Sequence, residues 1–232
     1  MLIRSLGCCG ALMVACSSSA QTVVLDATAE ATILNDPSLA IGDGRVFVGN
    51  NFQNSVRRGL GRFGLSSLPA GEVVSATLEV IVLSQRGFNL NFDAHRLMAD
   101  WNEGPTVGGG SNGGQGSPAV PADVTWTRTG LGTSWPAGGS FAATPTDSAS
   151  SQFAGTRLTF DLTDDVRAMR NKSLPDFGWI LISQTESVTG NVIALSTNDA
   201  GFPPMTLTVE IEDRCLADTN GDGIVPLADF NG

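Results

Sequence analysis

Apolar and polar residues alternate along several segments of the chain, and the clearest of them predicts the centre of the fold. Between Arg57 and Leu83, two long apolar segments flank Pro69-Ala70-Gly71. In the second segment the apolar residues recur at every other position: Ala76, Leu78, Val80 and Val82. A two-residue period is typical of a strand with one buried face. Since Pro presets φ and Gly accepts positive φ, we expect two strands joined by one tight turn.

Short segments of similar character follow one another along the rest of the chain. They predict strands over residues 23–31, 45–49, 92–98, 123–127, 157–162, 178–183, 192–195 and 205–211. One helix is expected over 164–170, with Thr163 as its N-cap and acidic residues in its first turn. About nine or ten strands result, which predicts an all-β fold of two packed antiparallel sheets, the β-sandwich, over residues 21–212.

A glycine-rich insert, residues 105–119, interrupts this pattern with the sequence PTVGGGSNGGQGSPA. Such a segment has high conformational entropy and cannot build a core. Its length predicts that it is either functional or disordered.

Composition agrees with the all-β prediction and limits the partners. The 232 residues include 28 Gly and 11 Pro, and only 16% are charged, which favours a sandwich or barrel over an α/β fold. The net charge of -10 argues against nucleic acid and against anionic lipid, because both attract basic surfaces. Neutral and cationic partners remain open.

Residues 1–20 have the pattern of a secretory signal peptide. Arg4 precedes an apolar centre, and the segment ends in SSSA, which suits cleavage before Gln21. The apolar run is too short to span a membrane, so we expect a secreted, extracellular or cell-surface protein. An alternative is lipidation at Cys16, which would anchor the chain to a membrane. Removal of the leader would leave Cys215 unpaired, which predicts a missing partner, an intermolecular bridge or a truncated chain, and we favour truncation.

The last segment, residues 213–232, has the spacing of a twelve-residue calcium loop. Gly223 at the sixth position permits the sharp turn that such a loop needs. The expected calcium ligands are Asp218, Asn220, Asp222, the carbonyl of Ile224, and Asp229. Asp at the twelfth position resembles a dockerin repeat, which implies a cohesin-like scaffold domain as a partner. Because Pro226 offers no side-chain oxygen and no second repeat follows, we expect a truncated repeat that binds calcium weakly.

The segment that centres the fold also resembles the DNRLRE domain, a β-sandwich module of secreted proteins. The motif R-x-L-x-R-F is matched by Arg58, Leu60, Arg62 and Phe63, and it is followed by Leu68-Pro69-Ala70-Gly71, Ser75-Ala76 and Leu78. Further matches in the same order are residues 94–97, 100–104, 123–126, 160–162 and 177–181. The resemblance implies a jelly-roll-like sandwich and, as in some members, binding of acidic polysaccharides.

Three arginines and two tryptophans are the candidate ligand-binding residues. Arg57, Arg58 and Arg62 could grip uronate or sulfate groups, because guanidinium matches a carboxylate in bidentate geometry. The alternative, which their alternation along the strand favours, is that they pair with carboxylates of the protein or lie solvated; the expected partners are Asp161, Asp164 and Asp165. Trp135, in an irregular loop, is the best candidate for stacking on a sugar, followed by Trp101, whereas Trp179 in an apolar strand is expected in the core.

No spacing in the sequence supports catalysis. His95 lacks neighbours for a metal site or a triad and is interpreted as a strand residue. A hydrolase or lyase would need two facing carboxylates, such as Asp100 or Glu103 with Asp161. We therefore expect a non-catalytic module that binds polysaccharide. The alternative is a structural or adhesive surface protein without sugar binding, and an enzyme is the third.

Overall fold

The computed structural model describes residues 14–15, 20–110, 114–198, 201–212 and 224–225, and it is an all-β fold with one α-helix. The helix is α1 (Thr163–Arg170), and a 3-10 turn, η1, covers Leu65–Ser67. The strands are β1 (Val14–Ala15), β2 (Ala20–Leu34), β3 (Leu39–Ala40), β4 (Val46–Asn50), β5 (Val56–Phe63), β6 (Glu72–Arg86), β7 (Leu90–Arg96), β8 (Ser117–Pro118), β9 (Asp147–Ser151), β10 (Arg157–Asp161), β11 (Trp179–Ser183), β12 (Val192–Leu195), β13 (Thr206–Glu212) and β14 (Ile224–Val225). Among the described residues, no helix is long and apolar enough to cross a bilayer.

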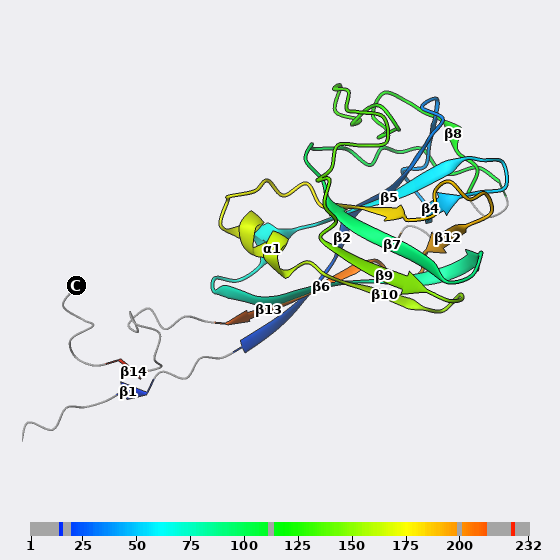
Figure 1. Ribbon diagram of the computed structural model, residues 1–232. Coiled ribbons are helices and arrows are strands. Elements are labelled where there is room, and N and C mark those ends of the chain that lie inside the picture. The colour runs from blue at the N-terminus through cyan, green and yellow to red at the C-terminus, as the bar shows by residue number, and fades with distance from the viewer. Residues whose placement is uncertain (1–13, 16–19, 111–113, 199–200, 213–223, 226–232) are drawn as a thin grey trace, which may run out of the picture.

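Ten of these strands form one antiparallel sheet that folds over into a jelly-roll-like sandwich (Figure 1). Its order is β2-β13-β6-β12-β4-β5-β11-β7-β9, and β10 adds to β6. Two strands of 15 residues each, β2 and β6, connect the layers. The first half of β2 pairs with β13 and its second half pairs with β5, while β6 pairs with β13 and β10 and then, at its end, with β12. The predicted sandwich is confirmed.

The prediction of a tight turn that joins two paired strands in the central segment is wrong. Both predicted strands exist, as β5 and β6, and the alternating burial of β6 is confirmed. However, residues 64–71 separate the two strands, with η1 among them, and β5 pairs with β2, β4 and β11 instead of β6. Alternation predicts which face of a strand is buried but carries no information about its neighbour in the sheet.

Apolar side chains of both layers meet in the main core. On β10 and the residue after it, Leu158, Phe160 and Leu162 are buried, and on β13 Leu207 and Val209 are buried, as their alternation predicts. Each such side chain contributes about 1.5–3 kcal/mol by leaving water. The sandwich therefore rests on the period of two that the sequence shows.

The helix begins one residue earlier than expected. Thr163 is the first helical residue of α1 and not its N-cap, which is Leu162. Asp161 accepts hydrogen bonds from the Thr163 N–H (2.9 Å) and hydroxyl (2.5 Å), and these bonds lower the pKa of Asp161. The Thr163 hydroxyl oxygen in turn accepts the Ala76 N–H (2.9 Å), which ties the helix start to β6.

The long connection between β7 and β9 covers the outer face of β5, β11 and β7 (Figure 1). It buries a second apolar cluster, which includes Leu60, Trp101, Val124, Trp135 and Ile180. The strand predicted over 123–127 is wrong: these residues form turns with one isolated bridge between Thr125 and Arg128. Val124 is buried and Trp126 half-buried there because the connection folds back on itself and not because they extend a sheet.

Candidate functional site

Arg58 is fully engaged by other parts of the protein. Its guanidinium forms two hydrogen bonds with the carboxylate of Glu186, both 2.8 Å, and donates a third to the Gly138 carbonyl (2.8 Å). It also lies over the rings of Trp126 and Phe141, at 4.8 and 5.4 Å from their centroids. Bidentate pairing and stacking of this kind fix the side chain in place. Arg58 therefore has a structural role and does not point at a ligand site.

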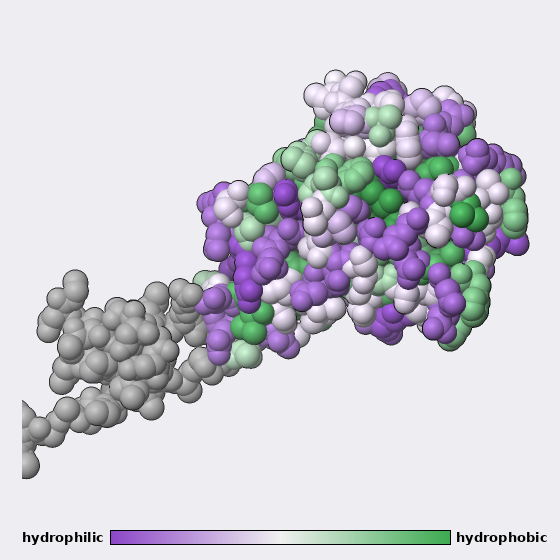
Figure 2. All heavy atoms as spheres, in the orientation of Figure 1, coloured by the Kyte–Doolittle hydropathy of each residue, from purple (hydrophilic) through white to green (hydrophobic). Residues whose placement is uncertain are grey.

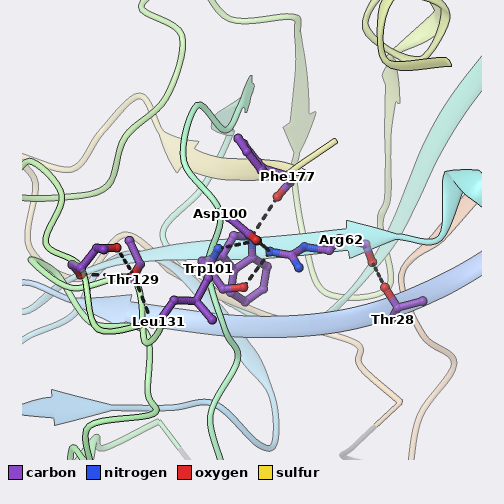
Figure 3. A network of polar contacts seen from close by, with 8 residues as sticks. Thr28, Arg62, Asp100, Trp101, Thr129, Leu131 and Phe177 are labelled. Carbon is purple, nitrogen blue, oxygen red and sulfur yellow. Dashed lines mark hydrogen bonds and ion pairs between the residues drawn. The ribbon is translucent and has the colours of Figure 1, made fainter. Parts of the chain in front are cut away.

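Arg62 is also paired, as Figure 3 shows, although its Nε has no hydrogen-bond partner among the described residues. It donates to the carboxylate of Asp100 (2.5 Å) and to the carbonyl of Trp101 (2.7 Å), and it lies 5.1 Å from the Trp101 ring centroid. The indole N–H of Trp101 donates to the Phe177 carbonyl (2.9 Å). This network joins β5 to the connections that cover it.

Arg58 and Arg62 thus pair with carboxylates other than the three expected ones. Asp164 pairs with Arg167 (3.3 Å) and Asp165 with Arg96 (3.6 Å), while Asp161 bonds Thr163. The sequence favoured paired arginines, and the structure places them so, but their partners come from loops that are distant in sequence.

The two candidate tryptophans are buried. Trp101 is 1% exposed and Trp135 is 7% exposed, and the indole N–H of Trp135 donates to the Thr125 carbonyl (3.0 Å). Burial of this degree argues against either ring as a platform for a sugar. Trp179 lies in the core, as predicted, and His95 is a buried strand residue whose Nδ1 lies 2.8 Å from the Ala142 carbonyl oxygen.

Arg57 points into a cavity of about 370 Å³, which is the size of a small-molecule site. The cavity, named here the arginine cavity, lies where β4, β5, the end of β6 and β12 meet the glycine-rich insert. Its lining includes Arg45, Arg57, Arg86, Phe47, Phe52 and Gln115. Among the described lining residues none is acidic, so the cavity carries three formal positive charges although the chain has a net charge of -10.

Arg57 is the most unusual residue of the cavity. It is 6% exposed, its Nε has no hydrogen-bond partner, and burial lowers its pKa. Within the described ranges, Arg45, Arg57 and Arg86 form no ion pair. Their guanidinium groups instead lie over Phe202, Phe47 and Phe52, at 5.3, 5.8 and 5.5 Å from the ring centroids.

Glycines of the insert allow its backbone to form one wall of the cavity. A Cβ at Gly114 would lie 3.1 Å from the Phe47 ring, so a larger residue would push the wall outward. Gly109 and Gln115 form an antiparallel bridge, with the Gln115 N–H 2.8 Å from the Gly109 carbonyl. Asp123 holds the start of the insert by accepting the N–H and hydroxyl of Thr106 (3.2 and 2.5 Å).

The sequence indicates Arg57 as a candidate but not the residues around it. Arg45 and Arg86 come from separate strand ends, and no local pattern connects them. Phe52 did carry a signal, because a phenylalanine between Asn51 and Gln53 interrupts a polar loop. An aromatic residue in such a context is a better candidate for an exposed platform than a tryptophan within an apolar segment.

The predicted calcium ligands Asp218, Asn220, Asp222 and Asp229 lie outside the described residues, as does most of the predicted leader. Of the predicted calcium loop the structure describes only Ile224–Val225, as β14, which pairs with Val14–Ala15.

The sequence matches no family model, and a search of curated proteins finds no match. The resemblance to the DNRLRE domain and the dockerin repeat therefore stays a prediction from the motifs.

Proposed function

We propose that the protein is a secreted, non-catalytic module that binds an acidic polysaccharide in the arginine cavity. The observation that carries the proposal is Arg57, a buried cation with an unpartnered Nε that lines a cavity whose described lining has no acidic residue. A buried charge is costly unless it is paired, and here the described part of the protein supplies no pair. A carboxylate or sulfate group of a ligand would supply one.

The remaining lining fits a saccharide. Arg45 and Arg86 add cationic donors, while Gln53 and Gln115 offer both donors and acceptors for hydroxyl groups. Apolar surface from Phe47 and Ile193 lies beside them. Mixed polar and apolar linings with a few convergent polar groups are typical of small-ligand sites.

The C-terminal segment extends the proposal to attachment. Its calcium-loop spacing supports a dockerin-like repeat that binds calcium and docks the sandwich onto a cohesin-like scaffold domain. Calorimetry of the full chain with calcium, alone and after Asp218→Ala, tests this part. Absence of calcium-dependent heat in the unmodified chain would remove it without affecting the cavity.

Affinity electrophoresis tests the central proposal, with polygalacturonate as the acidic probe and dextran as the neutral one. Retardation by polygalacturonate is expected, and Arg57→Met should reduce the affinity at least tenfold by removing the buried cation. Arg128→Met is the matched control, since it removes the same charge from a residue that does not line the cavity. It should leave retardation unchanged.

Two outcomes would favour other functions. Absence of retardation by any polysaccharide would overturn the proposal in favour of a structural or adhesive protein. Release of reducing ends or unsaturated products from the acidic probe would instead indicate a hydrolase or lyase.

A further inference from the structure

Phe52 is a large apolar side chain that the fold leaves 70% exposed at the mouth of the arginine cavity. It lies in the loop that joins β4 to β5, and the guanidinium of Arg86 lies 5.5 Å from its ring centroid. An aromatic ring and a cation are thus adjacent at the entrance. Figure 2 shows polar residues over most of the visible face, with apolar residues in small separate groups.

The loop that carries Phe52 is held by its own hydrogen bonds. The side-chain oxygen of Asn51 accepts the backbone N–H groups of Gln53 and Ser55, at 3.0 and 2.9 Å. The Asn51 N–H donates to the Ser55 carbonyl (3.2 Å), and Asn54 takes positive φ (58°) to close the turn. These bonds fix the backbone on both sides of Phe52.

A second loop lies against the ring. Gly190 donates its N–H to the Asn50 carbonyl (2.9 Å), and Asn50 donates to the Glu186 carbonyl (2.8 Å), so loop 184–191 is bound to the start of the Phe52 loop. A Cβ at Gly190 would lie 2.8 Å from the Phe52 ring. Because Gly190 and Arg86 lie against the ring, they restrict its motion, and a ligand that stacks on it loses less conformational entropy than it would on a ring without neighbours.

We propose that Phe52 is the specificity-determining platform of the site, where it stacks on the ring of an acidic sugar whose anionic group binds Arg57 and Arg86. The inference rests on the proposed function and adds the form of the ligand. Aromatic rings bind the C–H face of a pyranose through apolar contact, whereas an acyclic polyanion offers no such face. The site should therefore select cyclic sugar acids over acyclic polymers of equal charge.

Calorimetric titration with polygalacturonate and with poly-glutamate of matched length tests this selection. The unmodified protein should bind polygalacturonate at least tenfold more tightly. Phe52→Ala should lower that affinity about tenfold and leave binding of poly-glutamate unchanged, and Phe52→Trp should restore it. Phe88→Ala is the matched control, because Phe88 is 73% exposed and does not line the cavity, and it should change neither affinity.

Salt dependence separates stacking from charge. Phe52→Ala should lower the affinity for polygalacturonate by the same factor at about 0.05 M and about 0.3 M salt, because salt does not screen stacking. Arg86→Met should lose more at low salt than at high salt. A general structural effect of Phe52→Ala would lower the affinity for both polymers together, and that result would overturn the inference.

The two proposals fail differently. Polygalacturonate binding that Arg57→Met abolishes and Phe52→Ala leaves intact would overturn the platform and leave the proposed function standing. Equal affinity of the unmodified protein for the two polymers would do the same. Absence of polygalacturonate binding by the unmodified protein would overturn the proposed function itself.

Discussion

Arg57 and Arg58 are consecutive residues of β5 with opposite environments. Successive strand residues point to opposite faces, so Arg58 faces the connection that covers β5 while Arg57 faces the arginine cavity. Arg58 has a carboxylate, a carbonyl and two rings as partners, and Arg57 has one ring and an unpartnered Nε. The difference shows that two consecutive arginines of one strand can differ completely in pairing: Arg58 has a carboxylate partner on one face, and Arg57 has none among the described residues on the other.

The largest effect is expected on the paired face. Arg58→Met should lower the free energy of unfolding by about 2–3 kcal/mol, because it leaves the partly buried carboxylate of Glu186 without its partner. Urea denaturation measures the loss. The double variant with Glu186→Met should recover part of it, and strict additivity of the two substitutions would show that the pair is not coupled.

Gly138 tests how tightly Arg58 is packed. It has φ of +89°, and a Cβ there would lie 2.4 Å from Arg58 Nη1 and 3.1 Å from the Trp126 ring. Gly138→Ala should cost about 2 kcal/mol, through backbone strain plus displacement of the guanidinium. Gly132→Ala is the control, because Gly132 has φ of +82° with open space around it. It should cost only the backbone strain, about 1 kcal/mol. Equal losses of stability for the two variants in thermal denaturation would show that the Arg58 side chain can move aside without cost.

On the cavity face, replacing the arginine should raise the free energy of unfolding instead of lowering it. Arg57→Met should raise the free energy of unfolding by about 1 kcal/mol, because it removes a buried cation whose Nε has no partner. Urea denaturation without ligand measures the gain, and the same variant should bind acidic polysaccharide poorly. A loss as large as that of Arg58→Met would mean that Arg57 also stabilises the fold, and the contrast between the faces would fail.

The layers of the fold could be predicted from sequence because burial on a strand depends on local alternation. The buried sides of β6, β10 and β13 follow from their own residues. The pairing of β5 with β2 and β11 could not be predicted, because it depends on contacts between residues far apart in the chain. The strand predicted over 123–127 is wrong because a folded loop can bury the same residue types as a strand.

The site was less predictable than the fold for the same reason. The expected acidic partners of Arg58 are near the helix, but the actual one, Glu186, lies 128 residues along the chain. Nothing local distinguishes Arg57 from Arg58, since only the tertiary structure supplies one with a carboxylate and leaves the other without. Arg45, just before β4, and Arg86, at the end of β6, both line the cavity, and no motif connects them.

The smallest effect on the free energy of unfolding is expected at Asp176, a carboxylate that interacts with the charge of Arg62 on the paired face. Unlike Glu186, it is not fully paired. Burial raises the pKa of Asp176. The charge of Arg62 and the backbone N–H groups of Gly178 and Leu65 oppose that shift. The Oδ1 of Asp176 has no hydrogen-bond partner among the described residues. The contribution of Asp176 to stability is therefore complete below its ordinary pKa of 3.8 and is lost as the pH rises through the higher folded-state pKa. Asp176→Asn does not titrate, so at neutral pH it should be more stable than the unmodified protein by a few tenths of a kcal/mol, since solvent screens the partly exposed group.

Denaturation at several pH values measures this difference, which should vanish below about pH 3.8. Asp161→Asn is the matched control of opposite sign, because the hydrogen bonds from Thr163 lower the pKa of Asp161. That variant should be less stable at neutral pH, and its deficit should close only as the pH falls through the folded-state pKa of Asp161. A destabilised Asp176→Asn at neutral pH would mean that attraction to Arg62 outweighs burial, and Asp176 would then count as a second partner of Arg62 beside Asp100.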